Sequence, residues 1–329
     1  MATYTAIKGF KVQNLASDPS PATEGQVWYD TATNALKYTA QSTAWASGGV
    51  LNIARAYTAG CGTVDAALST SGNTPGTTPS NTTETYDGTT WSPVNNLGTA
   101  RYAAGCAGTQ TAALLFGGHP ATNAVEDWNG TSWTAASANL NLARGNVGPI
   151  GQVNTACLAV SGDYSNPPQG QTETWNGSTW TAGNNLQTPR TLAKAAAGTV
   201  TAGLAVTGDT NPPSVGRTSK VTEEYNGTTW SSVNDCNNIR YEAACTGAVQ
   251  TAATLFGGAT PGGLVPQTET YDGTTWTVSP ESLATARRAV GNNSGAASTA
   301  AMCIGGNPGY VNLVEEFTLG PTTKTVTTS

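Results

Sequence analysis

Two sets of charged residues recur at fixed places along the chain and are its first candidates for chemistry. Each of six arginines precedes a segment rich in small residues, and each of six glutamates lies two residues before an aromatic side chain. Six unpaired arginines in one ring would bind an anion, whereas six Arg–Glu pairs would tie a repeated structure together. Equal numbers at matching positions favour structural ion pairs, because unpaired charges packed close together are costly. The arginines are Arg55, Arg101, Arg144, Arg190, Arg240 and Arg287, and the glutamates are Glu84, Glu126, Glu173, Glu223, Glu269 and Glu315.

The other reactive side chains are few. Arg217 and Arg288 break the arginine periodicity and are better candidates for a specific role, although ordinary solvation would also explain them. His119 is the single histidine, so a site that needs two histidines is excluded. Neither the Cys-x-x-Cys spacing of metal sites nor the Asp-x-Asp-x-Asp-Gly calcium loop occurs, and we expect no metal or other cofactor.

Six cysteines are enough for three disulfides, but their places argue against pairing. Cys61, Cys106 and Cys245 follow a repeat arginine by five or six residues, where the neighbouring residues are mostly alanine or glycine. Such positions suit small buried side chains, so we expect free thiols. The remaining cysteines are Cys157, Cys236 and Cys303.

A repeated unit must position these side chains, and its clearest mark is a hairpin signature that occurs five times. An aromatic residue, Asp-Gly or Asn-Gly, two Ser or Thr residues and a Trp follow one another, as in Tyr86–Trp91. Asp-Gly and Asn-Gly tolerate the positive φ of tight hairpin turns, and the flanking aromatics can pair across the strands. The closing tryptophans are 42 to 50 residues apart, the period of four-stranded propeller blades. The other copies are Trp128–Trp133, Trp175–Trp180, Tyr225–Trp230 and Tyr271–Trp276.

Residues 100–134 show the strand order of one unit. Residues 101–108 are small and apolar, as expected for an innermost strand, and residues 111–118 form an apolar run that ends in a glycine pair. Residues 124–128 and 131–134 follow as the third and outer strands. The same order recurs after each repeat arginine, so the sequence predicts an all-β protein with six propeller blades.

The last unit lacks its closing tryptophan, because none follows Phe317, whereas the N-terminal segment supplies Trp45. A ring must cover the edges of its first and last blades, so we expect the strand around Trp45 to complete the sixth blade. The alternative is that residues 322–328 provide this strand and the N-terminal strands form an extra blade. The preferred organisation is an N-terminal anchoring arm, residues 1–34, and a propeller, residues 35–329.

The order of landmarks in each unit resembles the kelch repeat over roughly residues 49–318: arginine, small strand, apolar strand ending in glycines, then Glu-x-Tyr-x-Gly-x-x-Trp. The resemblance implies a six-bladed kelch-like β-propeller with a short N-terminal arm. It implies no single activity, because propellers serve many functions.

Two enzyme classes with related folds do not fit, and we expect no enzymatic activity. Kelch-like oxidases that hold copper need two histidines and paired tyrosines, but the chain has one histidine. In the Asp box of sialidase-like propellers the acid lies five residues before the tryptophan. Here it lies four residues before it and is Asn in three of five copies, so a turn role explains the motif. A glycan-processing enzyme therefore remains the weakest alternative.

A second resemblance involves Gly25–Tyr38, Gly-Gln-Val-Trp-Tyr-Asp-Thr-Ala-Thr-Asn-Ala-Leu-Lys-Tyr. This stretch is similar to a hairpin module near the N-termini of bacteriophage tail and appendage proteins, especially of phages that infect marine and cyanobacterial hosts. There it precedes Ala-Trp-Ala-Ser-Gly-Gly and kelch-like repeats, as in Ala44–Gly49 here. It implies a virion structural protein in a tail, appendage or decoration, assembled in the host cytoplasm and released by lysis. The alternative is a bacterial carbohydrate-binding or protein-interaction propeller.

Composition and charge restrict the partners. A net charge of −6, a pI near 4.8 and no basic run argue against nucleic acid. Residues 1–19 contain no export signal, and no apolar stretch approaches the roughly 20 residues of a membrane span. We expect other virion proteins to bind the arm through Phe10, Val12, Leu15 and Trp28. We also expect a homo-oligomer in the assembly, with a host-surface glycan as a further candidate partner.

The candidate recognition surface is a set of loops. Alternating strand directions put the loops between second and third strands on the same face as the connections between blades. The former vary in length while the hairpin turns do not, and variation on a constant frame is where repeat proteins usually keep a binding surface. The alternative is that they are solvated connections without a partner. The candidate contacts are His119, Tyr164, Asn166, Asn211 and Arg217.

Overall fold

The computed structural model describes residues 12–21, 23, 25–163, 170–190, 195–210 and 218–326. The expectation of an all-β fold is confirmed, because these residues form strands and no helix, and hence no helix that could cross a membrane. The chain divides into two compact units. The main unit is Trp45–Thr318, and the terminal unit combines Met1–Ala44 with Leu319–Ser329. The expected division after residue 34 differs from this one, which groups residues 35–44 and 319–329 with the N-terminal segment.

The main unit contains a series of antiparallel sheets in which the strands follow chain order. The first sheet consists of β4 (Ala59–Gly62), β5 (Ala67–Thr70), β8 (Thr83–Tyr86) and β9 (Trp91–Val94). The second consists of β10 (Gly105–Thr109), β11 (Ala112–Phe116), β12 (Val125–Trp128) and β13 (Trp133–Ala135). The third consists of β14 (Gly148–Val153), β15 (Ala156–Val160), β16 (Thr172–Trp175) and β17 (Trp180–Ala182).

Two further four-stranded sheets complete this series. The fourth consists of β18 (Ala196–Thr199), β19 (Ala202–Asp209), β20 (Thr218–Tyr225) and β21 (Trp230–Ser232). The fifth consists of β22 (Ala244–Val249), β23 (Ala252–Phe256), β26 (Gln267–Tyr271) and β27 (Trp276–Ser282). Small hairpins project from two loops: β6 (Asn73–Thr74) with β7 (Thr78–Pro79), and β24 (Ala259–Thr260) with β25 (Gly263–Leu264).

The sixth sheet has a different composition. Its strand order is β1 (Gln13–Leu15), β2 (Val27–Asp30), β3 (Ala35–Ser47), β29 (Val314–Thr325) and β28 (Ala300–Ile304). Residues 322–325 continue β29 and form no separate closing strand. The innermost strand expected after Arg287 is reduced to isolated bridges at Gly291 and Ser294. Side-chain hydrogen bonds take the place of backbone pairing there. The Asn293 amide donates to the Ala300 carbonyl at 2.7 Å and accepts from the Met302 N–H at 2.8 Å.

The repeated hairpins turn at glycine. φ lies between 90° and 94° at Gly88, Gly130, Gly177, Gly227 and Gly273. The preceding Asp or Asn contributes hydrogen bonds: Asp87 Oδ1 accepts from the amides of Thr89 and Thr90 at 2.9 and 2.7 Å. The flanking aromatics lie opposite each other, as Tyr86 and Trp91 do, with ring centroids 4.9 to 5.4 Å apart in the five copies. Each hairpin is thus held by a polar turn and an aromatic pair.

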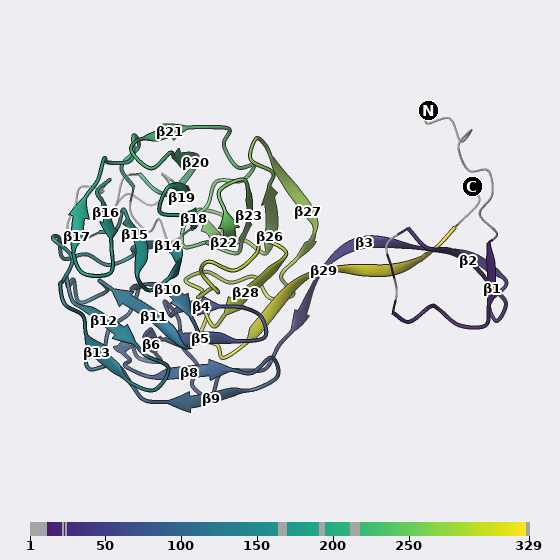
Figure 1. Ribbon diagram of the computed structural model, residues 1–329, viewed down its shortest axis with the longest axis horizontal. Coiled ribbons are helices and arrows are strands. Elements are labelled where there is room, and N and C mark those ends of the chain that lie inside the picture. The colour runs from purple at the N-terminus through teal and green to yellow at the C-terminus, as the bar shows by residue number, and fades with distance from the viewer. Residues whose placement is uncertain are drawn as a thin grey trace. The chain divides into compact units, whose positions relative to one another are not determined.

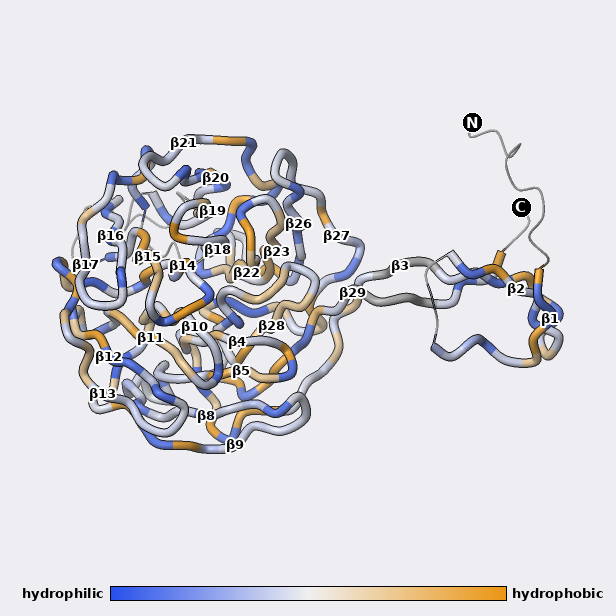
Figure 2. The backbone as a smooth tube through the Cα atoms, viewed as in Figure 1, coloured by the Kyte–Doolittle hydropathy of each residue, from blue (hydrophilic) through white to orange (hydrophobic). Residues whose placement is uncertain are grey.

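The core of the main unit lies between neighbouring sheets. Leu68 of the first sheet packs in one cluster with Leu115 and Trp128 of the second. Figure 1 shows β4, β10, β14, β18 and β22 near the middle of the main unit and β9, β13, β17 and β21 at its rim. Hydrophobic stretches follow the second strands of the sheets, such as β11 and β15 (Figure 2). Burial of these strands supplies most of the driving force for packing.

Neighbouring sheets are also joined by backbone hydrogen bonds near the inner strands. The Ala103 N–H donates to the Tyr57 carbonyl at 2.9 Å, linking the second sheet to the first. The Tyr57 N–H donates to the Ala289 carbonyl at 2.6 Å, and the Ala289 N–H to the Glu242 carbonyl at 3.0 Å. Each of these residues lies two positions after a repeat arginine, so the same repeat position carries these links.

Candidate functional site

Every repeat arginine is buried and paired with the glutamate of its own repeat. Both side chains of each pair are at most 9% exposed. The N–O distances are 3.0 Å for Arg55–Glu84, 3.1 Å for Arg101–Glu126, 2.5 Å for Arg144–Glu173, 2.8 Å for Arg190–Glu223 and 2.7 Å for Arg287–Glu315, and Arg240 contacts Glu269. Burial lowers the pKa of Arg55 to about 10 even though Glu84 opposes the shift. Guanidinium groups so enclosed have no free face for an anion.

Each repeat glutamate also accepts a hydrogen bond from the backbone. Its other carboxylate oxygen accepts a backbone N–H from the segment before the arginine, as Glu223 Oε2 does from Gln187 at 2.7 Å. The corresponding donors in the other units are the N–H groups of Asn52, Gly98, Asn141, Asn237 and Ala284. The carboxylate therefore fixes both its arginine and the connection between two sheets.

The centre of the main unit is nearly filled. Residues in or next to the innermost segments, among them Gly60, Ala104, Val147, Ala244 and Asn292, line a cavity of about 10 Å³. A cavity of this size holds about one water molecule.

We call the side of the main unit that carries the loops between second and third strands, together with the connections between sheets, the loop face. Backbone bridges pair these two kinds of segment, as in Tyr102 with His119, Gly145 with Asp163, and Tyr241 with Ala259. Residues that follow a repeat arginine are thereby held beside residues that follow the glycine at the end of a second strand.

A continuous series of side-chain contacts crosses the loop face. The ring centroids of Tyr57 and Tyr102 are 5.8 Å apart, and those of Tyr102 and His119 are 5.3 Å apart. His119 Nε2 lies 2.8 Å from Asp163 Oδ1, and the Asn146 amide donates to both Asp163 oxygens at 3.1 and 3.2 Å. Burial alone would raise the pKa of Asp163, but the hydrogen bonds from His119 and Asn146 lower it below its usual value.

The series continues from Tyr57 in the other direction. The Tyr57 hydroxyl donates to Glu242 Oε1 at 2.7 Å, and burial together with this carboxylate raises the pKa of Tyr57. Glu242 is buried and pairs with Arg288 at 3.0 Å, and Arg288 lies over the Tyr241 ring at 5.7 Å. We name the whole set the loop-face arc: Tyr57, Tyr102, His119, Asn146, Asp163, Tyr241, Glu242 and Arg288.

The backbone of the loop-face arc is strained at a repeated position. The residue two places after the arginine has a left-handed φ of 54° at Tyr57, 51° at Asn146 and 51° at Glu242. Such a conformation costs a non-glycine residue roughly 1–2 kcal/mol. Gly145 also has a spatial role, because a Cβ there would collide with the His119 ring. Strain of this kind is common at binding sites that the surrounding structure holds in place.

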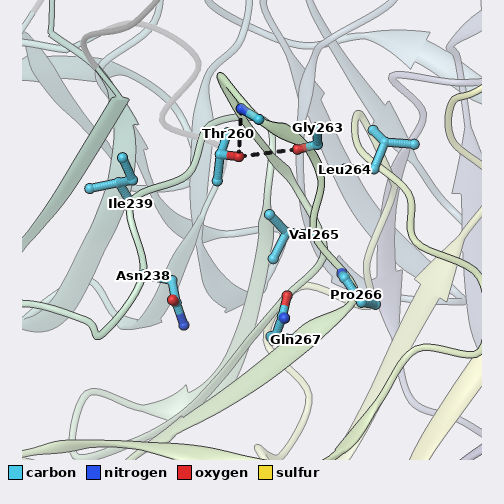
Figure 3. A pocket seen from close by; sticks show the side chains of 9 residues that line it. Asn238, Ile239, Thr260, Gly263, Leu264, Val265, Pro266 and Gln267 are labelled. Carbon is cyan, nitrogen blue, oxygen red and sulfur yellow. Dashed lines mark hydrogen bonds between the residues drawn. The ribbon is translucent and has the colours of Figure 1, made fainter.

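A second feature of the loop face is a depression of about 320 Å³ beside the β24–β25 hairpin. Figure 3 shows the side chains of Asn238, Ile239, Val265 and Gln267 around it, with Thr260 in the hairpin. The Thr260 hydroxyl accepts from the Gly262 N–H at 3.1 Å. The lining carries amide, hydroxyl and apolar groups and no charged residue. Two lining residues adjoin the loop-face arc. Ile239 lies two residues before Tyr241, and Thr260 follows Ala259, which pairs with Tyr241.

Of the recognition residues expected from the sequence, His119 belongs to the loop-face arc. Tyr164, Asn166, Asn211 and Arg217 lie outside the described residues. Arg288, singled out for breaking the repeat, also belongs to the arc. Sequence reasoning missed Tyr57, Tyr102, Asn146, Asp163, Tyr241 and Glu242. For all of these except Asp163 the signal was variation at the two positions after each constant arginine, which read Ala-Tyr, Tyr-Ala, Gly-Asn, Tyr-Glu and Arg-Ala in the described copies.

The expected anchor residues divide between two environments. Trp28 is 1% exposed, so its side chain is not accessible to a partner, and Phe10 lies outside the described residues. Val12 is exposed and Leu15 half-buried. Strand alternation explains why Trp28 is buried: it lies opposite Lys37 and on the same side of β2 as buried Asp30.

The other side of this small sheet is apolar and accessible. Val27 lies opposite Tyr38, and Tyr29 lies opposite Leu36, so all four share one side of the sheet. Val27 is 47% exposed, and Leu36 and Tyr38 are each 37% exposed. Exposed Val326 adjoins them, because its N–H donates to the Leu36 carbonyl at 2.8 Å. We call these five residues the apolar face of the terminal unit.

All six cysteines are unpaired and buried, and burial raises the pKa of Cys236 and of Cys303 to about 12. Among the residues that the structure describes, no three His, Cys, Asp or Glu side chains are grouped as ligands of a metal ion. No protein-family model matches the chain, and no curated protein matches it significantly.

Proposed function

We propose that the main unit is a closed, six-bladed kelch-like β-propeller in which the strand around Trp45 is the outer strand of the sixth blade. Three contacts of Trp45 support this. Its ring lies 5.2 Å from Phe317, as other closing tryptophans lie beside the aromatic of their own sheet. It also lies 5.0 Å from Phe256 of the preceding sheet, as Trp180 lies 5.2 Å from Phe116.

The third contact is a hydrogen bond. Trp45 Nε1 donates to Thr268 Oγ1 at 2.8 Å. Trp133 and Trp276 donate in the same way to Thr83 and Thr222 of the preceding sheets, both at 3.0 Å. The backbone bond from Tyr57 to Ala289 further supports closure between the first and sixth repeats.

The protein then acts as a non-enzymatic virion structural component of a phage tail, appendage or decoration. In this role the terminal unit docks onto a neighbouring virion protein and the loop face binds a ligand, such as a glycan of the host surface. The observation that carries the proposal is the apolar face of the terminal unit, because exposed apolar residues gathered on one side of a sheet mark interaction surfaces. The likeness of residues 25–38 to phage appendage hairpins supports a virion as the place of docking.

The test is particle incorporation by complementation of a phage that lacks the gene. We expect the double variant Val27→Asp and Leu36→Asp to fold with an unchanged main unit but to be missing from purified particles. The matched control is Val249→Asp, since Val249 is 49% exposed in the main unit and should tolerate a charge. Normal incorporation of the double variant would refute docking through this face. Absence of the unmodified chain from particles would favour the bacterial propeller instead.

A further inference from the structure

We propose that the loop-face arc binds a neutral saccharide, an inference that rests on the recognition role proposed above and specifies its ligand. The first argument is the type of residue. Tyr57, Tyr102 and Tyr241 are partly exposed rings, and within the described part of the chain the hydroxyls of Tyr102 and Tyr241 have no hydrogen-bond partner. An aromatic ring with a free polar tip matches a sugar ring, which presents apolar C–H faces and hydroxyl edges.

The second argument is charge, which separates neutral from acidic ligands. Arg288 is paired with Glu242, and His119 with Asp163, so the arc has no cation without a counter-ion. The chain as a whole carries a net charge of −6. A carboxylate, sulfate or phosphate group on the ligand would therefore meet no unpaired cation and would be repelled over longer range, whereas a neutral sugar would not.

The third argument is preorganisation. Asp163 is fixed by His119 and Asn146, and Tyr57 by Glu242, before any ligand arrives. Side chains that are already ordered cost less entropy on binding. The uncharged depression at Asn238, Thr260 and Gln267 lies next to Tyr241, and its volume of about 320 Å³ falls within the usual range of about 300–1,000 Å³ for small-molecule sites. It offers a second position for a chain of sugar units.

The experiment is calorimetric titration of the full-length protein with two sets of probes at one ionic strength. The neutral set consists of oligosaccharides from dextran, mannan and galactan, and the acidic set of oligosaccharides from alginate, hyaluronan and polysialic acid. We expect binding to a member of the neutral set, weakened about tenfold by Tyr102→Ala and less by Tyr102→Phe, which removes only the free hydroxyl. The control is Val249→Ala, a truncation of an exposed side chain of the main unit that belongs to neither the arc nor the apolar face, and it should leave affinity unchanged.

Three results would overturn the inference: preference for the acidic set, binding that the Tyr102 variants do not affect, or no binding to either set. Capture of a protein instead of a saccharide by the loop face would count among them. Because Tyr102→Phe keeps the ring and its packing, loss of binding in that variant cannot be assigned to unfolding. Incorporation into particles is scored separately, so a failure here leaves docking of the terminal unit untouched.

Discussion

At the scale of single residues, the same six-fold use of Arg and Glu solves a packing problem. An ion pair buried between sheets is tolerable only if every charged oxygen has a partner. In each unit the glutamate meets this condition by contacting both its arginine and a backbone N–H of the preceding connection, as Glu223 does with Arg190 and Gln187. Each pair is therefore a structural clamp, and we propose that ligands bind the variable residues next to it.

Glu223→Gln should destabilise the protein severely. The change leaves Arg190 charged and buried without its counter-ion, and loss of one partner of such a pair costs about 3–5 kcal/mol. Urea unfolding measures the free energy of unfolding, with the exposed Glu281→Gln as the matched control. A loss no larger than that of the control would contradict the clamp.

Asp163 makes stability depend on pH. Because its pKa is lower in the folded chain than in the unfolded chain, its contribution is fully present above the unfolded value of about 3.9 and is lost as pH falls through the folded value. Stability of the wild type and of Asp163→Asn, measured from about pH 5 to pH 2, should therefore converge as the solution is acidified. A difference that stays constant over this range would show that Asp163 is not held as its carboxylate.

At the scale of elements, β3 takes the place that the outer strand of a hairpin takes in the other sheets. In the first five sheets the outer strand follows directly after the turn, whereas the sixth sheet takes β3 from the start of the chain. Trp45 brings the same contacts that hairpin tryptophans bring, to Phe317, Phe256 and Thr268. The sheet is thereby joined from both ends of the sequence.

Trp45→Ala should cost about 3 kcal/mol, the lower end of the range for truncation of a buried aromatic, because Trp45 is only partly buried. Thermal and urea unfolding measure the loss. Tyr38→Ala is the matched control, since it removes an exposed ring from the same strand. Equal stability of the two variants would mean that the strand around Trp45 does not seal the sixth sheet.

The repeat made the regular parts of the structure predictable. The arginine and glutamate recur in all six units and the glycine turn in five, so the strand order and the ion-pair partners follow from one copy. The loop-face arc could not be found in this way, because Tyr57 and Glu242 are 185 residues apart and meet only through tertiary packing. Trp28 illustrates another limit of the sequence. Its size and apolar character suggest a contact residue for a partner, whereas alternation along β2 buries Trp28 and exposes Val27.

The innermost segment of the sixth repeat was expected to form a strand, but it forms only isolated bridges. Asn292 and Asn293 bind backbone groups with their side chains, so the chain around them needs no continuous ladder. Asn competes with the backbone for hydrogen bonds in this manner wherever a regular strand is not enforced. A pattern of small residues alone does not reveal this competition.

At the scale of the whole molecule, the two compact units present surfaces of opposite character. The terminal unit has an apolar face of Val27, Tyr29, Leu36, Tyr38 and Val326, and the main unit has the polar and aromatic loop-face arc. An apolar face suits a stable contact, whereas paired charges and partly exposed aromatic rings suit a reversible one. This difference is the physical basis for assigning docking to one unit and recognition to the other.

The central proposal, that the terminal unit docks the protein while the loop face stays free to bind, is tested most directly by cryo-electron microscopy of phage particles into which the chain is proposed to assemble. The account predicts density for a six-bladed ring on the particle, with Val27, Leu36 and Tyr38 against a neighbouring virion protein. Tyr102 and His119 should face solvent in the same reconstruction. A ring seated on the particle through its loop face, with the apolar face of the terminal unit in solvent, would contradict the account.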